Sequence, residues 1–153
     1  MIRAALFAAV AMLMPSAAAG QNTRLNIGGF NGNIGTASVA NFDAGMRTSA
    51  NDMTYTVTIA SLSDQRNTSV YVRANAATMG GSKPVSDVEW RRDDLSVWNP
   101  LTTSDVLIES RTIQTNGTSW ANSLWFRCNL NWTSDVSLAY STTITITLQV
   151  TAP

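Results

Sequence analysis

The sequence predicts an all-β fold, an antiparallel sandwich of seven or eight strands that forms one domain behind an export signal. Three observations support this class. Apolar and polar side chains alternate in several segments, those segments are rich in threonine, valine and isoleucine, and no run with helical 3.6-residue spacing follows the leader. Because a sheet with one apolar face must hide that face against another layer, strands of this kind are expected to pack as two facing sheets.

The first 19 residues have the three parts of a cleavable signal peptide. A positive start at Arg3 precedes an apolar run over residues 4–14, and a small-residue tail ends at Ala19. The apolar run is shorter than the roughly 20 residues of a spanning helix, so we expect cleavage after Ala19 and no membrane span. Residues 20–153 would then form the mature domain, and we expect it to be secreted, periplasmic or at the cell surface. The short leader and the single cysteine, which allows no internal disulfide, favour a bacterial source.

Composition excludes several classes of function. The chain has no histidine, so histidine-based triads, metal sites and proton relays are ruled out. Ten basic residues balance ten acidic ones, and only 13% of residues are charged, which leaves no electrostatic footprint for nucleic acid or an anionic membrane. We therefore expect a protein that is not an enzyme and that uses no cofactor or metal.

Three segments carry the strongest strand pattern, 53–60, 124–132 and 142–150. In the second, the apolar face includes Cys128 and ends at Trp132. We interpret Cys128 as a small buried hydrophobe rather than a reactive thiol, since no cationic neighbour on that face would lower its pKa.

Five further strands are predicted with a weaker pattern. Turn-forming residues such as glycine, proline and asparagine separate them. These strands are expected over residues 23–27, 37–42, 69–74, 87–91 and 105–113.

The turn at Asn116-Gly117 fixes a register if the strands on either side are hairpin partners. A two-residue loop would place Glu109 on the core face, whereas a three-residue loop with Gly117 in the left-handed conformation pairs Ile108 with Leu124. We predict the three-residue form because it buries apolar against apolar. A connection that crosses between the two sheets would remove the basis of this register.

The acidic residues give little sign of a catalytic pair. Glu89 and Glu109 are the only glutamates, and nothing in their spacing suggests the convergent carboxylates of a glycosidase. Glu89 is expected to point to solvent. In the charged run 87–94, two arginines interleave with the carboxylates, which favours a solvated turn with local ion pairs over a calcium site.

The five tryptophans divide into two groups. Trp90 and Trp132 fall on faces expected to be buried. Trp98, Trp120 and Trp125 fall in loops or on the opposite face, where exposed rings can stack on sugars or anchor partners. The alternative is that a loop or a second layer covers them, because tryptophan is highly buried on average.

Asp135–Thr142 and the alternating strand that follows resemble the ending of bacterial secreted spore coat protein U-like and pilin-like domains, with Tyr140 at the position of that family's tyrosine. Residues 83–91 are also similar to stretches of secreted bacterial β-sandwich proteins. The resemblance implies an immunoglobulin-like or pilin-like sandwich that is exported and assembles at the cell surface. The family's paired cysteines and the aromatic tail of usher-type pilins are absent. The Tyr140 hydroxyl would tie the loop to the last strand as in a tyrosine corner, or the ring is plain core.

These observations lead to two functional expectations. The first is a structural or adhesive protein, a subunit of a surface filament or coat, that associates with itself, with other surface proteins or with glycans. If subunits exchange strands, residues 21–35 are the expected donor, although they are equally a plausible first strand. The alternative is a carbohydrate-binding module that uses Trp98, Trp120 or Trp125 as its platform.

Overall fold

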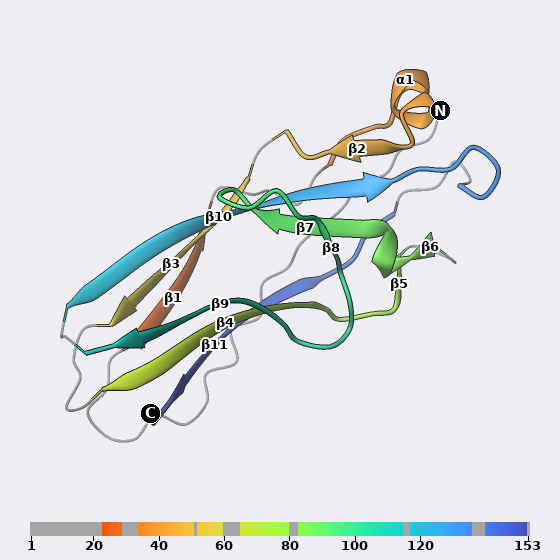
Figure 1. Ribbon diagram of the computed structural model, residues 1–153. Coiled ribbons are helices and arrows are strands. Elements are labelled where there is room, and N and C mark those ends of the chain that lie inside the picture. Colours follow the sequence, from red (N-terminus) through yellow and green to blue (C-terminus); the bar gives the residue numbers. More distant parts are fainter. Residues whose placement is uncertain are drawn as a thin grey trace.

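The structure, a computed structural model, describes residues 23–28, 34–50, 52–59, 65–79, 83–114, 117–135 and 140–152. Within these ranges the chain forms eleven strands and two short helices (Figure 1). The seven longer strands are β1 Thr23–Gly28, β3 Met53–Ile59, β4 Arg66–Ala74, β7 Val88–Arg92, β9 Val106–Ile113, β10 Thr118–Asn129 and β11 Ile144–Thr151. The short elements are α1 Val39–Asp43, β2 Met46–Thr48, β5 Thr78–Met79, β6 Lys83–Pro84, the 3-10 helix η1 Val85–Asp87 and β8 Asn99–Pro100. The predicted leader and its cleavage point at Ala19 lie outside the described residues.

Two antiparallel sheets make up the body of the domain. Sheet A has the order β1-β3-β10-β7-β8, with β2 also paired to β10, and sheet B has the order β11-β4-β9. A small third sheet joins β5 and β6. Figure 1 shows the long strands of A and B as two layers that run side by side along the molecule. The predicted antiparallel β-sandwich is therefore confirmed, and its seven longer strands correspond to seven of the eight predicted ones.

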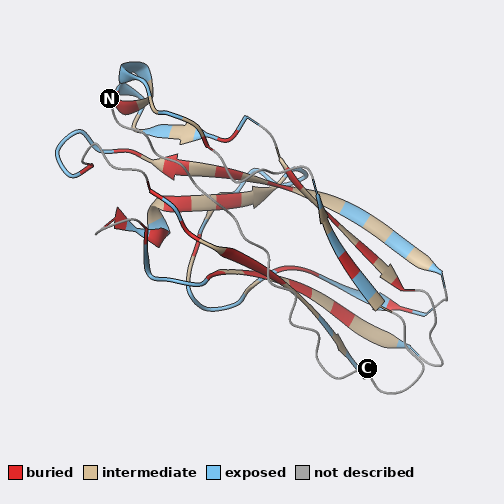
Figure 2. Ribbon diagram, turned by 180° about the vertical axis from the view of Figure 1, so that it is seen from behind, coloured by how far each residue is buried: buried red, intermediate tan, exposed pale blue. Residues whose placement is uncertain are grey.

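Alternating burial along the strands builds the core between the two sheets. In β3, Met53, Tyr55, Val57 and Ile59 are all buried, while the threonines between them are half-buried. β4 alternates in the same way, and Figure 2 shows the buried and less buried residues following one another along both sheets. Hiding this apolar surface from water is the main stabilising contribution to such a fold.

The buried face of β10 is shorter than predicted. Leu124, Phe126 and Cys128 are buried as expected, but the strand ends at Asn129 and the chain then turns. Trp132 is therefore 54% exposed instead of lying in the core. Its ring packs on Phe42 of α1, with 4.6 Å between the ring centres, so the prediction for Trp132 was wrong.

The strand predicted over residues 37–42 is also wrong, because this segment forms helix α1. Ser38 begins the helix with a capping box, in which its side chain accepts the Asn41 backbone N–H and the Asn41 side chain accepts the Ser38 N–H. This reciprocal pair satisfies two backbone donors that a strand would leave to a neighbour. Only Phe42 of the helix is buried, so packing adds a single anchor.

The hairpin register at Asn116-Gly117 is wrong because β9 and β10 belong to different sheets. β9 pairs with β4 in sheet B, and β10 pairs with β3, β7 and β2 in sheet A. The connection thus crosses from one sheet to the other, and Ile108 does not pair with Leu124. Gly117 is left-handed as predicted, with φ of +72°. Asn116 lies outside the described residues.

None of the helices in the described part of the chain has the length and apolarity needed to cross a membrane.

Candidate functional site

A bulge in β9 turns Glu109 into the space between the sheets. Val70 of β4 pairs with Glu109 and Tyr71 pairs with Leu107, so Ile108 is an extra residue on β9. A bulge of this kind changes which face the following side chains occupy. Ile108 and Glu109 are consequently both buried although they are neighbours in sequence. The predicted hairpin register kept the Glu109 carboxylate off the core face, whereas in the structure this carboxylate is buried.

The Glu109 carboxylate accepts hydrogen bonds from both sheets. Its Oε1 accepts from the Tyr55 hydroxyl at 2.8 Å and from the Trp120 indole at 2.6 Å. Its Oε2 accepts from the Asn122 side-chain amide at 2.9 Å and from Arg111 Nη2 at 3.2 Å. Tyr55 lies on β3, and Trp120 and Asn122 lie on β10, so one carboxylate of sheet B is held by three donors of sheet A. We call these five residues the Glu109 cluster.

Charge balance in the Glu109 cluster favours the ionised carboxylate. Arg92 approaches from β7, with its Nη1 3.6 Å from Oε2 of Glu109. Burial by itself would raise the pKa of Glu109, but the hydrogen bonds from Trp120 and Tyr55 and the charge of Arg111 outweigh it and leave that pKa below its usual value. Burial also raises the pKa of Tyr55, which keeps its hydroxyl a donor. Because both oxygens of this ionised carboxylate accept hydrogen bonds, Glu109 links sheet B to sheet A.

Glu89 and Glu109 do not converge. Glu89 lies between the buried residues Val88 and Trp90 of β7 and so points away from the core. It accepts a hydrogen bond from Arg127, its register partner on β10, and this pair half-buries it instead of leaving it in solvent. Trp90 is buried as predicted.

The three tryptophans proposed as a platform do not share one surface. Trp120 is half-buried against the core, its indole nitrogen is bonded to Glu109, and Arg111 lies 4.8 Å from its ring centre. Trp125 alternates with buried residues of β10 and therefore lies on the outer face of sheet A, opposite Arg91 in the register. Trp98 joins that outer face through its contacts with Arg91 and Arg127.

Arginine and tryptophan side chains gather on the outer face of β7 and β10. The Trp98 ring lies 4.5 Å from the guanidinium carbon of Arg127 and 5.1 Å from that of Arg91. Arg91 also donates to the backbone carbonyl of Leu95 at 2.7 Å, which anchors the segment that carries Trp98. These cation–π contacts hold the Trp98 ring against the outer face of sheet A. One of the two arginines, Arg127, lies on β10, the strand that also carries Trp125. We call Trp98, Trp125, Arg91 and Arg127 the outer aromatic face.

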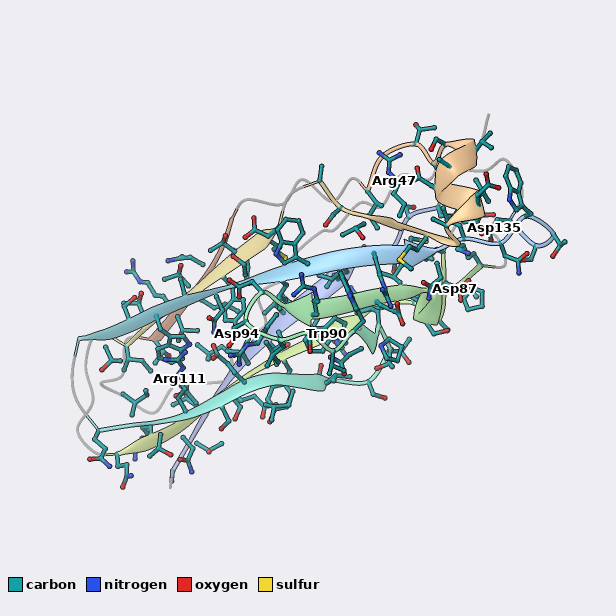
Figure 3. The ribbon with its side chains drawn as sticks, turned by 45° about the horizontal axis from the view of Figure 1, so that its top comes forward. Arg47, Asp87, Trp90, Asp94, Arg111 and Asp135 are labelled. Atoms are coloured by element: carbon teal, nitrogen blue, oxygen red, sulfur yellow. The ribbon has the colours of Figure 1, made fainter. Side chains whose placement is uncertain are left out.

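A second buried polar cluster surrounds Lys83. Its Nζ donates to Asp135 Oδ1 at 2.7 Å and to Asp87 Oδ2 at 2.8 Å, and it lies 5.6 Å from the ring centre of Tyr140. Burial lowers the pKa of Lys83, but the hydrogen bonds that its ammonium donates to the two carboxylates outweigh this effect and leave the pKa raised. Figure 3 places Asp87 and Asp135 near one end of the molecule, away from Arg111 of the Glu109 cluster. This cluster was not predicted from the sequence, which placed Asp87 in a solvated turn.

Tyr140 and Cys128 lie beside the Lys83 cluster. Tyr140 is buried, and the predicted tie from its hydroxyl to the last strand stays a prediction. Cys128 is buried as expected. Lys83 is a cationic neighbour that the sequence did not reveal, yet desolvation dominates and raises the pKa of the Cys128 thiol to about 11.

The described ranges show local ion pairs and no metal site. They contain no group of three or more acidic or cysteine side chains arranged to hold a metal ion. Arg92 of the run 87–94 pairs with Asp94, with Nε 2.8 Å from Oδ1, which is a local ion pair of the expected kind.

Comparison with known proteins adds no family to this description. No protein-family model matches the chain, and a search of curated proteins finds no match either. A function therefore has to be inferred from the sandwich, the two buried polar clusters and the outer aromatic face.

Proposed function

We propose that this protein is a non-catalytic, secreted structural or adhesive β-sandwich of bacterial origin, a subunit that associates with other copies of itself in a surface filament or coat. The observation that supports this proposal is the position of β1 at the edge of sheet A. β1 pairs only with β3 among the described strands, through six consecutive antiparallel partners from Thr23 with Ile59 to Gly28 with Thr54.

An edge strand of this kind can be supplied by a second copy. Leu25, opposite Val57 in the register, is buried, whereas Asn26 is exposed. A β1 strand from another subunit would make the same backbone hydrogen bonds and fill the same apolar position, so exchange loses no contact. Ile27 and Ile34 add further apolar anchors from the predicted donor segment 21–35, while Phe30 of that segment lies outside the described residues.

Deleting residues 20–35 tests the exchange. We expect the shortened protein to stay folded and monomeric in analytical ultracentrifugation, and to bind a synthetic peptide of residues 21–35. A peptide with Leu25→Asp should not bind, and one with Asn26→Asp, which changes the exposed neighbour, should bind as well as the natural peptide. A deletion variant that is unfolded and not rescued by the peptide, or a full-length protein that is monomeric at all concentrations, would contradict the proposal.

A second candidate function is carbohydrate binding, and the outer aromatic face favours it. Trp98 and Trp125 place two half-buried rings on one side of the sheet, and Arg91 and Arg127 supply donors beside them. Rings and guanidinium groups together suit a sugar that presents one apolar face and hydroxyl or carboxylate groups at its edge.

Alanine substitutions separate the two candidates. Trp98→Ala and Trp125→Ala should each abolish glycan-array signal, while Trp132→Ala, which removes an exposed ring packed on α1, should leave it unchanged. Trp120→Ala is not a clean probe because it also removes a donor to Glu109. A wild-type protein without glycan signal would exclude this function and leave self-association untouched.

A further inference from the structure

Lys83 is the only lysine of the chain, and the other nine basic residues are arginines. It is also the most enclosed cation, since no arginine among the described residues is buried. Arginine is the usual choice for a buried ion pair, because its guanidinium stays charged and forms several hydrogen bonds in a fixed plane. The one lysine therefore occupies the one buried cationic position that the structure describes, which indicates a requirement for an amine.

The surroundings of Lys83 bring the amine against a carboxyl group that is equally enclosed. The side chains of Lys83 and Asp135 are each 3% exposed, and Nζ lies 2.7 Å from Oδ1. The other oxygen of Asp135 accepts the Asn131 backbone N–H at 2.8 Å, which fixes the carboxyl group in place. Asp87 approaches the same Nζ at 2.8 Å from η1, and its side chain is 37% exposed.

Apolar and aromatic neighbours shield this contact from water. Met79, the register partner of Lys83 in the small sheet, is fully buried, and Val85 two residues further on is also buried. Tyr140 covers another side with its ring. Two reacting groups held in contact react as if at very high concentration. Transfer of one proton from the Lys83 ammonium to the Asp135 carboxylate within this contact gives the neutral amine that can act as a nucleophile.

We propose that Lys83 and Asp135 form an intramolecular isopeptide bond, an amide between Nζ of Lys83 and Cγ of Asp135, with Asp87 as the proton carrier. One proton passes from the ammonium to a carboxyl oxygen of Asp135, and the freed electron pair on Nζ attacks Cγ to form the C–N bond. Asp87 takes a second proton from Nζ and passes it to the same oxygen, whose C–O bond breaks, and the oxygen leaves as water. One ammonium and one carboxylate become one amide and one water, so atoms and charge balance without any co-reactant.

The bond would lock together segments that are 52 positions apart in sequence. It would join β6 to the chain that follows β10, at the end of the sandwich where Figure 3 shows Asp87 and Asp135. It would also replace a buried ion pair, which carries a desolvation cost, with a neutral group. A covalent tie restricts the unfolded chain in the way a disulfide does, and this chain has only one cysteine.

Mass spectrometry of the complete mature protein in denaturant tests the bond. We expect a mass lower by one water than the sequence requires, and a proteolytic fragment that joins the peptides of Lys83 and Asp135. Because Lys83 is the only lysine, an amine-directed reagent applied to the unfolded protein should label the N-terminal amine and no side chain.

Three variants complete the test. Lys83→Arg keeps the positive charge but cannot form the amide, so its mass should show no loss. Asp87→Asn keeps both partners and removes the proton carrier, so the bond should form about 100-fold more slowly and freshly made protein should retain its ε-amine. Asp94→Asn, which changes an acid paired with Arg92, should behave as wild type. A wild-type protein of full mass whose Lys83 is labelled after unfolding, or a water loss that maps elsewhere, would overturn the proposal.

Discussion

Glu109 shows how one side chain can join two sheets. A buried carboxylate is costly unless donors and positive charges surround it, because it loses its hydration. Here Tyr55, Trp120 and Asn122 supply the donors, and Arg111 adds a charge-assisted bond. Removing the carboxylate would leave these groups without their acceptor.

We expect Glu109→Ala to lower the free energy of unfolding by about 3 kcal/mol, since breaking a buried, hydrogen-bonded charge leaves its partners unsatisfied. Glu89→Ala is the matched control. It removes the other glutamate, whose pair with Arg127 lies on the outer face, and should cost about 1 kcal/mol or less. Urea denaturation of both variants measures the difference, and equal losses would contradict the role given to the Glu109 cluster.

The lowered pKa of Glu109 should make the stability of the protein depend on pH. The pKa of Glu109 is lower in the folded protein than its ordinary value of 4.5, so the unfolded chain binds more protons in that range. Its contribution is complete above the unfolded pKa and is lost as pH falls through the folded pKa. Wild type should therefore melt at a higher temperature than Glu109→Gln near neutral pH, and this difference in melting temperature should become smaller below about pH 4.5. A gap between them that is constant from pH 7 to about pH 3 would count against this assignment.

Strand β9 carries the feature that positions the Glu109 cluster. Its buried apolar residues change parity, from Ile108 at an even position to Ile113 at an odd one, while Leu107 is exposed. The bulge at Ile108 explains the change, because one extra residue shifts every later side chain to the opposite face. Val106, Leu107 and Ile108 are all apolar, so the sequence fits either face at this point, and only the burial of Ile108 and Glu109 shows where the bulge lies.

The start of β10 offers a test of backbone conformation. Gly117 has φ of +72° and open space where a Cβ would lie, whereas Gly28 of β1 has equally open space and no positive φ. Gly117→Ala should destabilise by about 1–2 kcal/mol from left-handed strain alone, and Gly28→Ala should be neutral or slightly stabilising. Thermal denaturation compares the two. Similar effects of both changes would mean that the conformation of Gly117 does not limit the turn.

At the scale of the whole molecule, the sandwich holds a polar cluster toward each end and an apolar core along its length. Figure 3 shows Arg111 of the Glu109 cluster toward one end and Asp87 and Asp135 of the Lys83 cluster toward the other. Residues of both sheets share the core, so the sheets should unfold together rather than separately.

Cys128 reports on that cooperativity because it is the only thiol and is buried with a pKa of about 11. We expect a thiol-directed reagent at neutral pH to label native protein only at the rate of global unfolding, and unfolded protein at once. The labelling rate should rise with urea in parallel with unfolding followed by tryptophan fluorescence. Fast labelling of native protein would show that the sheet A end near Lys83 opens by itself.

The sequence by itself determined the fold class and seven of the long strands, because alternation between apolar and polar side chains is a local property that each segment carries alone. It also indicated the core positions of Trp90 and Cys128. The tertiary structure decided which strands share a sheet, and this choice placed β9 and β10 apart, turned Glu109 inward and brought Asp87, Asp135 and Lys83 together. Such pairings depend on contacts between distant segments, where a single extra residue or a crossing connection changes the neighbours of every side chain that follows.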